Sequence, residues 1–229
     1  MRVADHRWLS LAFRLVLLLL LLALAAGVGY AVLSLPDQMV GLSERVGANM
    51  QTSGVQNPVT AVLLNFRGYD TLLEMAVLLV ALLGVWSLGS AEAHRRVDPD
   101  PVLSLLVGGL VPMMIMMAGY LLWVGANAPG GAFQAGSVLA ASGILLLLSR
   151  KRFPVRMMGW PLRVVLVLGL GVFTMVGVTL LSVSGVFLQY PSGLAGALIL
   201  FIEAAATLSI GVALAALFLG GWPQAGPFR

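Results

Sequence analysis

The chain of 229 residues has no cysteine, two histidines and a single lysine, Lys151. Without cysteine it cannot form a disulfide, a thiolate metal site or a cysteine nucleophile. His6 and His94 lie far apart in the sequence and make a poor metal site, so we expect no bound metal and no cofactor. The basic residues form no stripe that alternates with aromatic residues, which argues against nucleic-acid binding despite the net charge of +4.

Charged residues are also scarce, at 10% of the chain, whereas hydrophobic residues make up 60% and the mean hydropathy is +1.01. This composition is typical of an integral membrane protein. A helix needs about 20 mostly apolar residues to cross the hydrocarbon of a bilayer. We therefore predict an all-α, polytopic membrane protein with about six transmembrane helices, near residues 15–35, 71–90, 102–124, 133–149, 164–188 and 194–220.

The basic residues are distributed unevenly between the predicted loops. With the N-terminus inside, the inner segments carry eleven arginine and lysine residues, and the outer segments carry only Arg45 and Arg67. Cytoplasmic segments of membrane proteins are enriched in basic residues. The asymmetry predicts that both termini are cytoplasmic and that the protein is a multi-pass protein of the cell inner (plasma) membrane.

Two carboxylates lie inside the apolar segments, Glu74 in TLLEMAVLLVALLGV and Glu203 in ALILFIEAAATLSIGVAL. A charge at bilayer depth costs about 2.5–3.5 kcal/mol on insertion scales, so such residues usually face protein or a cavity and often move ions or protons. Both glutamates are therefore candidates for an ion or proton path. The alternatives are that Glu203 is a protonated acid making one interhelical hydrogen bond, and that Glu74 reaches interfacial water.

A charged cluster precedes Glu74 in the sequence. Arg67, Asp70 and Glu74 have the spacing i, i+3 and i+7, which places them on one face of a continuous helix. In the functional interpretation they form a charged funnel that leads to Glu74. In the structural interpretation Arg67 forms an ion pair with Asp70 at the N-terminus of a helix.

A bend is expected just before the second span. Asn57-Pro58 is typical of a turn or of a helix start. A straight helix from Val59 to Ser90 would be about 48 Å long at 1.5 Å per residue, which is too long to cross a bilayer upright. We therefore predict a short helix at 59–66 on the membrane surface and a bend near Arg67-Gly68.

The segment NAPGGAFQAG, residues 127–136, interrupts the apolar pattern between the third and fourth spans. Gly130 and Gly131 disfavour a helix, and Pro129 cannot donate a backbone hydrogen bond, so we expect a helix break. Irregular backbone at membrane depth is tolerated where it is buried or lines a cavity, and such breaks bind ions in some transporters. The alternative is a tight hairpin whose glycines allow close packing.

Two of these segments resemble parts of a known family. VTAVLLNFRGYDTLLEMAVLLVALLGV resembles the V-T-x-V-x-V-D-F-R-x-x-D-T-x-G-E segment at the tail of the large subunit of Mrp-type (multi-subunit) cation/proton antiporters, and that segment is a separate small protein, the E subunit, in membrane-bound hydrogenases. PGGAFQAGSVLAA is similar to the P-G-G-G-F-Q-G-G signature of the Mrp B subunit (MnhB). Matched position by position, the resemblance implies roles for Arg67, Asp70, Thr71, Glu74, Gly130, Gly131, Phe133, Gln134, Gly136 and Glu203.

The chain departs from the family pattern at four places. Ala132 and Ala135 replace glycines of the signature, Leu73 replaces the glycine before the first glutamate, and alanines replace the glycine-rich sequence after Glu203. All of these replacements except Leu73 keep small residues. The two resemblances meet at the polar segment 91–101, which predicts a two-span domain at 1–95 and a four-span MnhB-like domain at 96–229.

The resemblance implies an accessory membrane subunit of a Na⁺/H⁺ antiporter that contributes to the ion path and to assembly. Its partners would be other subunits of a hetero-oligomer and the lipid bilayer, and Na⁺ and H⁺ would be the transported ions. No lysine occurs in any predicted span, unlike in the pumping subunits of the family, so we expect neither catalysis nor transport by the chain alone. Two alternatives stay open, namely a membrane-arm subunit of a complex-I-like redox-driven ion pump such as a membrane-bound hydrogenase, and a purely structural adaptor.

Overall fold

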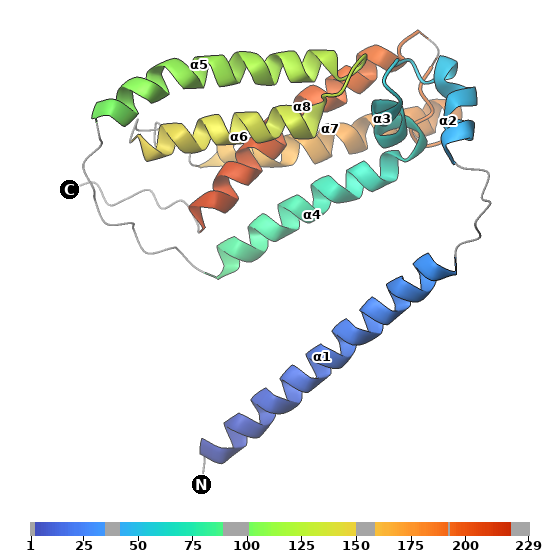
Figure 1. Cartoon of the computed structure of the whole chain (residues 1–229). Coiled ribbons are helices and arrows are strands. Elements are labelled where there is room, and N and C mark those ends of the chain that lie inside the picture. The colour runs from blue at the N-terminus through green and yellow to red at the C-terminus, as the bar shows by residue number, and fades with distance from the viewer. Residues whose placement is uncertain (1–2, 35–41, 89–100, 150–158, 192, 221–229) are drawn as a thin grey trace. The chain divides into compact units, whose positions relative to one another are not determined.

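The computed structural model of the chain describes residues 3–34, 42–88, 101–149, 159–191 and 193–220. The chain divides into two compact units, Met1–Glu44 and Arg45–Arg229 (Figure 1). The first unit consists mainly of helix α1 (Val3–Leu33), and α2 (Leu42–Asn49) begins at its end. The predicted linker at 91–101 lies almost wholly outside the described residues, so the division into 1–95 and 96–229 stays a prediction.

The regular elements in the described ranges are all helices, which confirms the predicted all-α membrane fold. Five of them contain a segment long and apolar enough to cross a membrane: Phe13–Leu33 of α1, α4 (Gly68–Ser87), α5 (Pro101–Val124), α7 (Trp160–Ser184) and α8 (Ala195–Leu219). The predicted short fourth span corresponds to α6 (Ala132–Leu148), which is apolar but has only 17 residues. The cytoplasmic location of both termini stays a prediction.

Helix α8 lies at the centre of the second unit, where it packs on α6, α7 and α4. In its most apolar window 56% of the residues are buried, the largest share among the five candidate spans. Small residues allow this packing, because a Cβ atom added to Gly136 of α6 would lie 2.8 Å from Ile210 of α8. Membrane helices approach most closely where small residues face a neighbour. The central position of α8 brings segments from both halves of the chain around it.

The chain enters α4 through a distorted helical segment. Asn57 caps the short helix α3 (Pro58–Ala61), because its Oδ1 accepts a hydrogen bond from the Val59 amide at 3.1 Å. Helix α3 continues into the π-helical turn η2 (Val62–Phe66), and Arg67, with φ −129° and ψ 36°, separates η2 from α4. The break therefore lies where the sequence predicts a bend.

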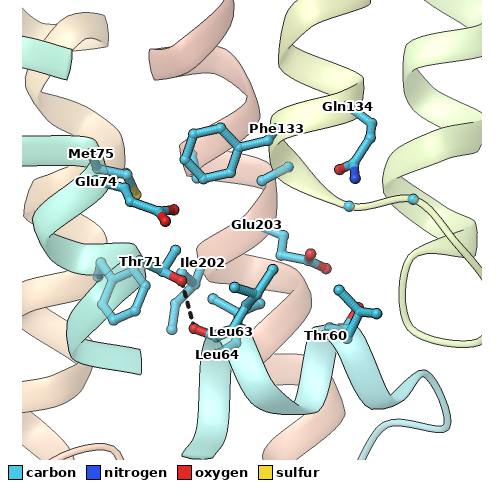
Figure 2. A pocket seen from close by; sticks show the side chains of 16 residues that line it. Thr60, Leu63, Leu64, Thr71, Glu74, Met75, Phe133, Gln134, Ile202 and Glu203 are labelled. Carbon is cyan, nitrogen blue, oxygen red and sulfur yellow. Dashed lines mark hydrogen bonds between the residues drawn. The ribbon is translucent and has the colours of Figure 1, made fainter. Parts of the chain in front are cut away.

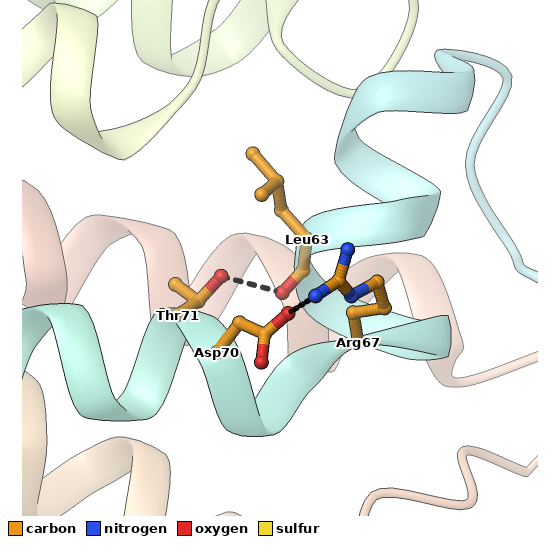
Figure 3. Close-up of polar contacts among 4 residues, drawn as sticks. All are labelled: Leu63, Arg67, Asp70 and Thr71. Atoms are coloured by element: carbon orange, nitrogen blue, oxygen red, sulfur yellow. Dashed lines mark hydrogen bonds and ion pairs between the residues drawn. The ribbon is translucent and has the colours of Figure 1, made fainter. Parts of the chain in front are cut away.

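Side chains bind two carbonyl oxygens of η2. The Thr71 hydroxyl donates to the carbonyl oxygen of Leu63 at 2.7 Å (Figure 3), and the Tyr190 hydroxyl donates to that of Leu64 at 3.1 Å. Carbonyl groups at an interrupted helix need such partners when no water is nearby. The two hydrogen bonds hold η2 against α4 and against the loop between α7 and α8.

Candidate functional site

A cavity of about 250 Å³ lies beside α8, where α3, η2, α4 and the start of α6 meet. Its lining is mostly apolar, and its polar side chains are Thr60, Thr71, Glu74, Gln134 and Glu203. Figure 2 shows Glu74 reaching toward this space from α4 and Glu203 from α8, with the ring of Phe133 projecting from α6. The fold thus brings the two intramembrane carboxylates to one cavity, although they come from opposite halves of the chain.

Glu203 is buried, with 4% of its surface exposed. The backbone amide of Ala132, the first residue of α6, donates a hydrogen bond to its carboxyl group. A helix N-terminus carries a partial positive charge, so it stabilises a carboxylate placed there. The second carboxyl oxygen, Oε2, is buried and has no hydrogen-bond partner within the described part of the chain. Buried polar atoms usually have a hydrogen-bond partner, so this oxygen is the strongest indication that the site lacks a polar group that would bind there.

Gly131 provides the space that Glu203 occupies. It precedes α6 with φ +106°, a backbone conformation that favours glycine. A Cβ atom at this position would lie 2.7 Å from Oε1 of Glu203. The amide of Gly131 donates to the carbonyl oxygen of Leu121 at 2.9 Å, which ties the turn to the end of α5. The glycine therefore meets both a conformational and a steric requirement.

The half of the chain that contains this turn and Glu203 matches a family model. Residues 102–222, more than half of the 229 residues, match a domain related to the MnhB subunit of Na⁺/H⁺ antiporters. The chain belongs to this MnhB-related family. Residues 15–101 match a second family model, MbhE, which describes a subunit of MBH. No curated protein matches the chain.

Two solved structures are similar to the chain. One is from an archaeal respiratory membrane complex, the membrane-bound sulfane sulfur reductase, with a TM-score of 0.66 and 23% identity over 90% of this chain and 97% of that chain. The other is from the Mrp complex of a Dietzia species, with a TM-score of 0.63 and 22% identity. The match covers 96% of this chain and 27% of the Mrp chain. At these identities the likeness shows the fold, and a shared fold does not by itself fix a function.

The signature residues of the MnhB-related region lie in three different places. Pro129, Gly130 and Gly131 lie outside helices, between α5 and α6. Phe133 and Gln134 lie in the first turn of α6 and line the cavity, so they belong to the helix that follows the break. Gly136, one turn further on, packs against α8 and does not line the cavity. Only part of this group is therefore in contact with the cavity.

The predicted site residues in α4 and at Arg67, just before it, fall into two groups. One group lines the cavity, and the other lies on the surface. Glu74 lines the cavity and is exposed, whereas Thr71 is buried and uses its hydroxyl to hold the carbonyl group of Leu63. Arg67 and Asp70 form an ion pair at 2.5 Å, with 61% and 46% of their side chains exposed, and neither lines the cavity (Figure 3). Asp70 lies in the first turn of α4, where its charge suits the helix dipole. This geometry matches the structural interpretation of the pair.

Sequence reasoning missed the contact that joins the two halves beside the cavity. The Thr60 hydroxyl donates to the carbonyl oxygen of Gly125 at 2.6 Å, and the side-chain Nδ2 of Asn57 donates to those of Gly125 and Ala128 at 3.1 and 2.8 Å. These bonds dock the start of α3 on the turn that leads to Gly131. Asn57-Pro58 indicates a helix start in the sequence, but no local pattern indicates the distant acceptors.

Proposed function

We propose that the chain is an accessory membrane subunit of a multi-subunit Na⁺/H⁺ antiporter, that it contributes part of the ion path, and that it lies in the plasma membrane. Membership of the MnhB-related family supports Na⁺ and H⁺ as the ions. The fold similarity to chains of two membrane complexes supports partner subunits. In this proposal the chain binds and passes ions together with its partners and carries out no catalysis of its own.

The observation that carries the proposal is the cavity that Glu74 and Glu203 share. A water molecule takes up about 30 Å³ of liquid, so a cavity of about 250 Å³ has room for several waters. Oε2 of Glu203 lacks a hydrogen-bond partner among the described residues, which leaves it available to a proton, a water or a cation. Ionisable groups inside a membrane protein commonly mark such paths.

In the proposed mechanism both carboxylates bind the ion or proton, Glu203 in the buried part of the cavity and Glu74 on its exposed side. The amide of Ala132 holds the Glu203 carboxyl group in place at the start of α6, so that a proton or cation is gained and lost without movement of the helix. Glu74, on the exposed side of the cavity, exchanges the ion with the path in the rest of the complex. The mostly apolar lining lowers the local dielectric constant, which strengthens both interactions.

The direct test is Glu203→Gln in the assembled complex. Glutamine keeps the shape of the side chain and its ability to form hydrogen bonds but does not titrate, so we expect normal assembly and loss of Na⁺/H⁺ exchange in membrane vesicles. Glu203→Asp should keep part of the exchange activity. Ser209→Ala is the matched control, because Ser209 is a buried polar residue of α8 that lies outside the cavity and bonds to Leu166. An assembled Gln variant that exchanges ions like the parent would show that Glu203 is structural.

A redox-linked complex is the second candidate function. The match of residues 15–101 to the MbhE family model and the fold similarity to a chain of a respiratory sulfane sulfur reductase favour it. The chain itself would hold no redox centre in either case. Composition of the complex purified in mild detergent separates the two, because a co-purifying iron–sulfur protein would identify the redox-linked complex.

A further inference from the structure

The cavity lies between α4 on one side and the start of α6 on the other. Helix α4 packs mainly on α7 and α8, whereas α6 packs mainly on α5 and α8, so α8 forms the floor between them. On the two sides of the cavity, Glu74 of α4 and Gln134 of α6 are exposed, and Glu203 of α8 is buried between them (Figure 2). The exposure of Glu74 and Gln134 indicates an opening of the cavity between α4 and α6, and in a membrane-spanning region such an opening needs a cover.

At the opening the exposed polar side chains are those of Glu74 and Gln134, and the exposed side of α4 next to Glu74 is apolar. Leu73, Val77 and Val80 of α4 are exposed by 60%, 67% and 66%. A carboxylate is unfavourable in contact with lipid, so ionisable residues in membrane helices usually face protein or a cavity. The exposed side of α4 therefore suits a protein neighbour that satisfies the carboxylate while contacting the apolar residues.

Charge indicates which side chain this neighbour carries. The lining of the cavity includes two carboxylates and, among the described residues, neither lysine nor arginine. Arg67, the nearest basic residue along the chain, forms its ion pair with Asp70 and does not line the cavity. A second copy of the chain, related by a two-fold axis through this opening, would present the same lining, which has carboxylates and no lysine or arginine, so it would not supply the missing basic group.

We propose that a transmembrane helix of a partner subunit covers the opening between α4 and α6 and presents a basic side chain, from lysine, arginine or histidine, to Glu74. This inference rests on the proposed function for the existence of partner subunits. The basic side chain compensates the charge of the carboxylate, and the helix that carries it closes the cavity against lipid. It also makes Glu74 the residue through which this subunit recognises its neighbour, whereas Glu203 remains inside the chain.

Site-directed photo-crosslinking in the purified complex tests this surface. A benzophenone amino acid replaces Val77, one helical turn from Glu74, and in a second variant it replaces Leu73. The matched control replaces Met116, a residue of α5 that is exposed by 70% and does not line the cavity. We expect both α4 probes, but not the control, to crosslink to one transmembrane helix of another subunit, with a lysine, arginine or histidine within one turn of the attachment point. Attachment to lipid alone, to a second copy, or to a helix without a basic residue would overturn the proposal.

Charge reversal tests the proposed pair itself. Glu74→Lys should release the crosslinked subunit from the purified complex, and changing that subunit's basic residue to glutamate should restore it. If Glu74→Lys releases the subunit and the double reversal does not restore it, the ion pair is excluded. These readouts measure assembly, so a complex that assembles as expected but exchanges no Na⁺ for H⁺ would refute the proposed function and leave this interface intact.

Discussion

Glu74 and Glu203 are the same residue type in two apolar helices and line the same cavity, but their surroundings differ. Glu203 is buried between α8 and the start of α6, and it receives a hydrogen bond from the amide of Ala132. Glu74 lies on the exposed side of α4, beside Leu73 and Val77. The chain itself therefore positions the carboxylate of Glu203, whereas the carboxylate of Glu74 stays exposed and available to a neighbouring subunit.

The difference between the two sites comes from packing across helices, because both sequence neighbourhoods are apolar. Helix α8 contacts α4, α5, α6 and α7, so protein surrounds most of it. Helix α4 contacts α7, α8 and η2, and it leaves Leu73 and Val77 exposed. In the proposed path Glu203 therefore binds the proton or cation inside the chain, whereas Glu74 both exchanges the ion and contacts a neighbouring subunit.

Comparison of the Gln variants of the two glutamates should give the largest effects. We expect Glu203→Gln to abolish exchange in an assembled complex, because it is the one buried carboxylate among the described residues. Glu74→Gln should lower exchange and also weaken retention of the neighbouring subunit, since the carboxylate loses its charge at an exposed surface. Exchange in vesicles and subunit composition, measured on the same preparations, separate these outcomes. Equal loss of exchange with full assembly in both variants would show that the two carboxylates have the same role.

Gly131→Ala should come next in size. The added Cβ would lie 2.7 Å from Oε1 of Glu203, and φ +106° costs a residue other than glycine about 1–3 kcal/mol. We expect displacement of Glu203, loss of most exchange activity and a lower melting temperature in detergent. Gly171→Ala in α7 is the control, because a Cβ there meets nothing within 4 Å and alanine favours the helix. Parent-like exchange by Gly131→Ala would show that the position of Glu203 is unimportant.

Thr71→Val should have an intermediate effect on stability. Valine keeps the shape of threonine but leaves the carbonyl oxygen of Leu63 without the hydroxyl donor, which costs about 1 kcal/mol. Thr71→Ser should keep the hydrogen bond and lie close to the parent in thermal unfolding measured in detergent. A valine variant as stable as the serine variant would contradict a role for this bond in holding η2 at the break.

The Arg67–Asp70 ion pair should contribute least. Both side chains are well exposed, and exposed pairs stabilise proteins by about 0–1 kcal/mol after solvent screening. We expect Arg67→Ala to leave exchange near that of the parent and to shift the melting temperature slightly, with a smaller shift at high salt. A loss of exchange as large as that of Glu203→Gln would instead support the charged funnel as part of the ion path.

Local sequence patterns determined much of this fold. The apolar stretches predict the helices because each must satisfy its backbone within itself in a membrane. Asn57-Pro58 predicts the start of α3, and the excessive length of an unbroken helix from Val59 to Ser90 predicts the break at Arg67 before α4. These features depend on residues a few positions apart, so a single sequence is enough to find them. Glu74 and Glu203 also stand out by the cost of a carboxylate in an apolar helix.

Only the tertiary structure decided which of these residues act together. The contact of Gly131 with Glu203 and the docking of Asn57 and Thr60 on Gly125 join positions far apart in the sequence. In the folded chain Glu203 is buried, Glu74 is exposed, and Arg67 and Asp70 lie outside the cavity. Such outcomes depend on how close two helices approach and which faces they turn to each other. Small residues permit close approach in several packing arrangements, so the sequence alone does not distinguish among these arrangements. The tertiary structure shows which one the chain adopts.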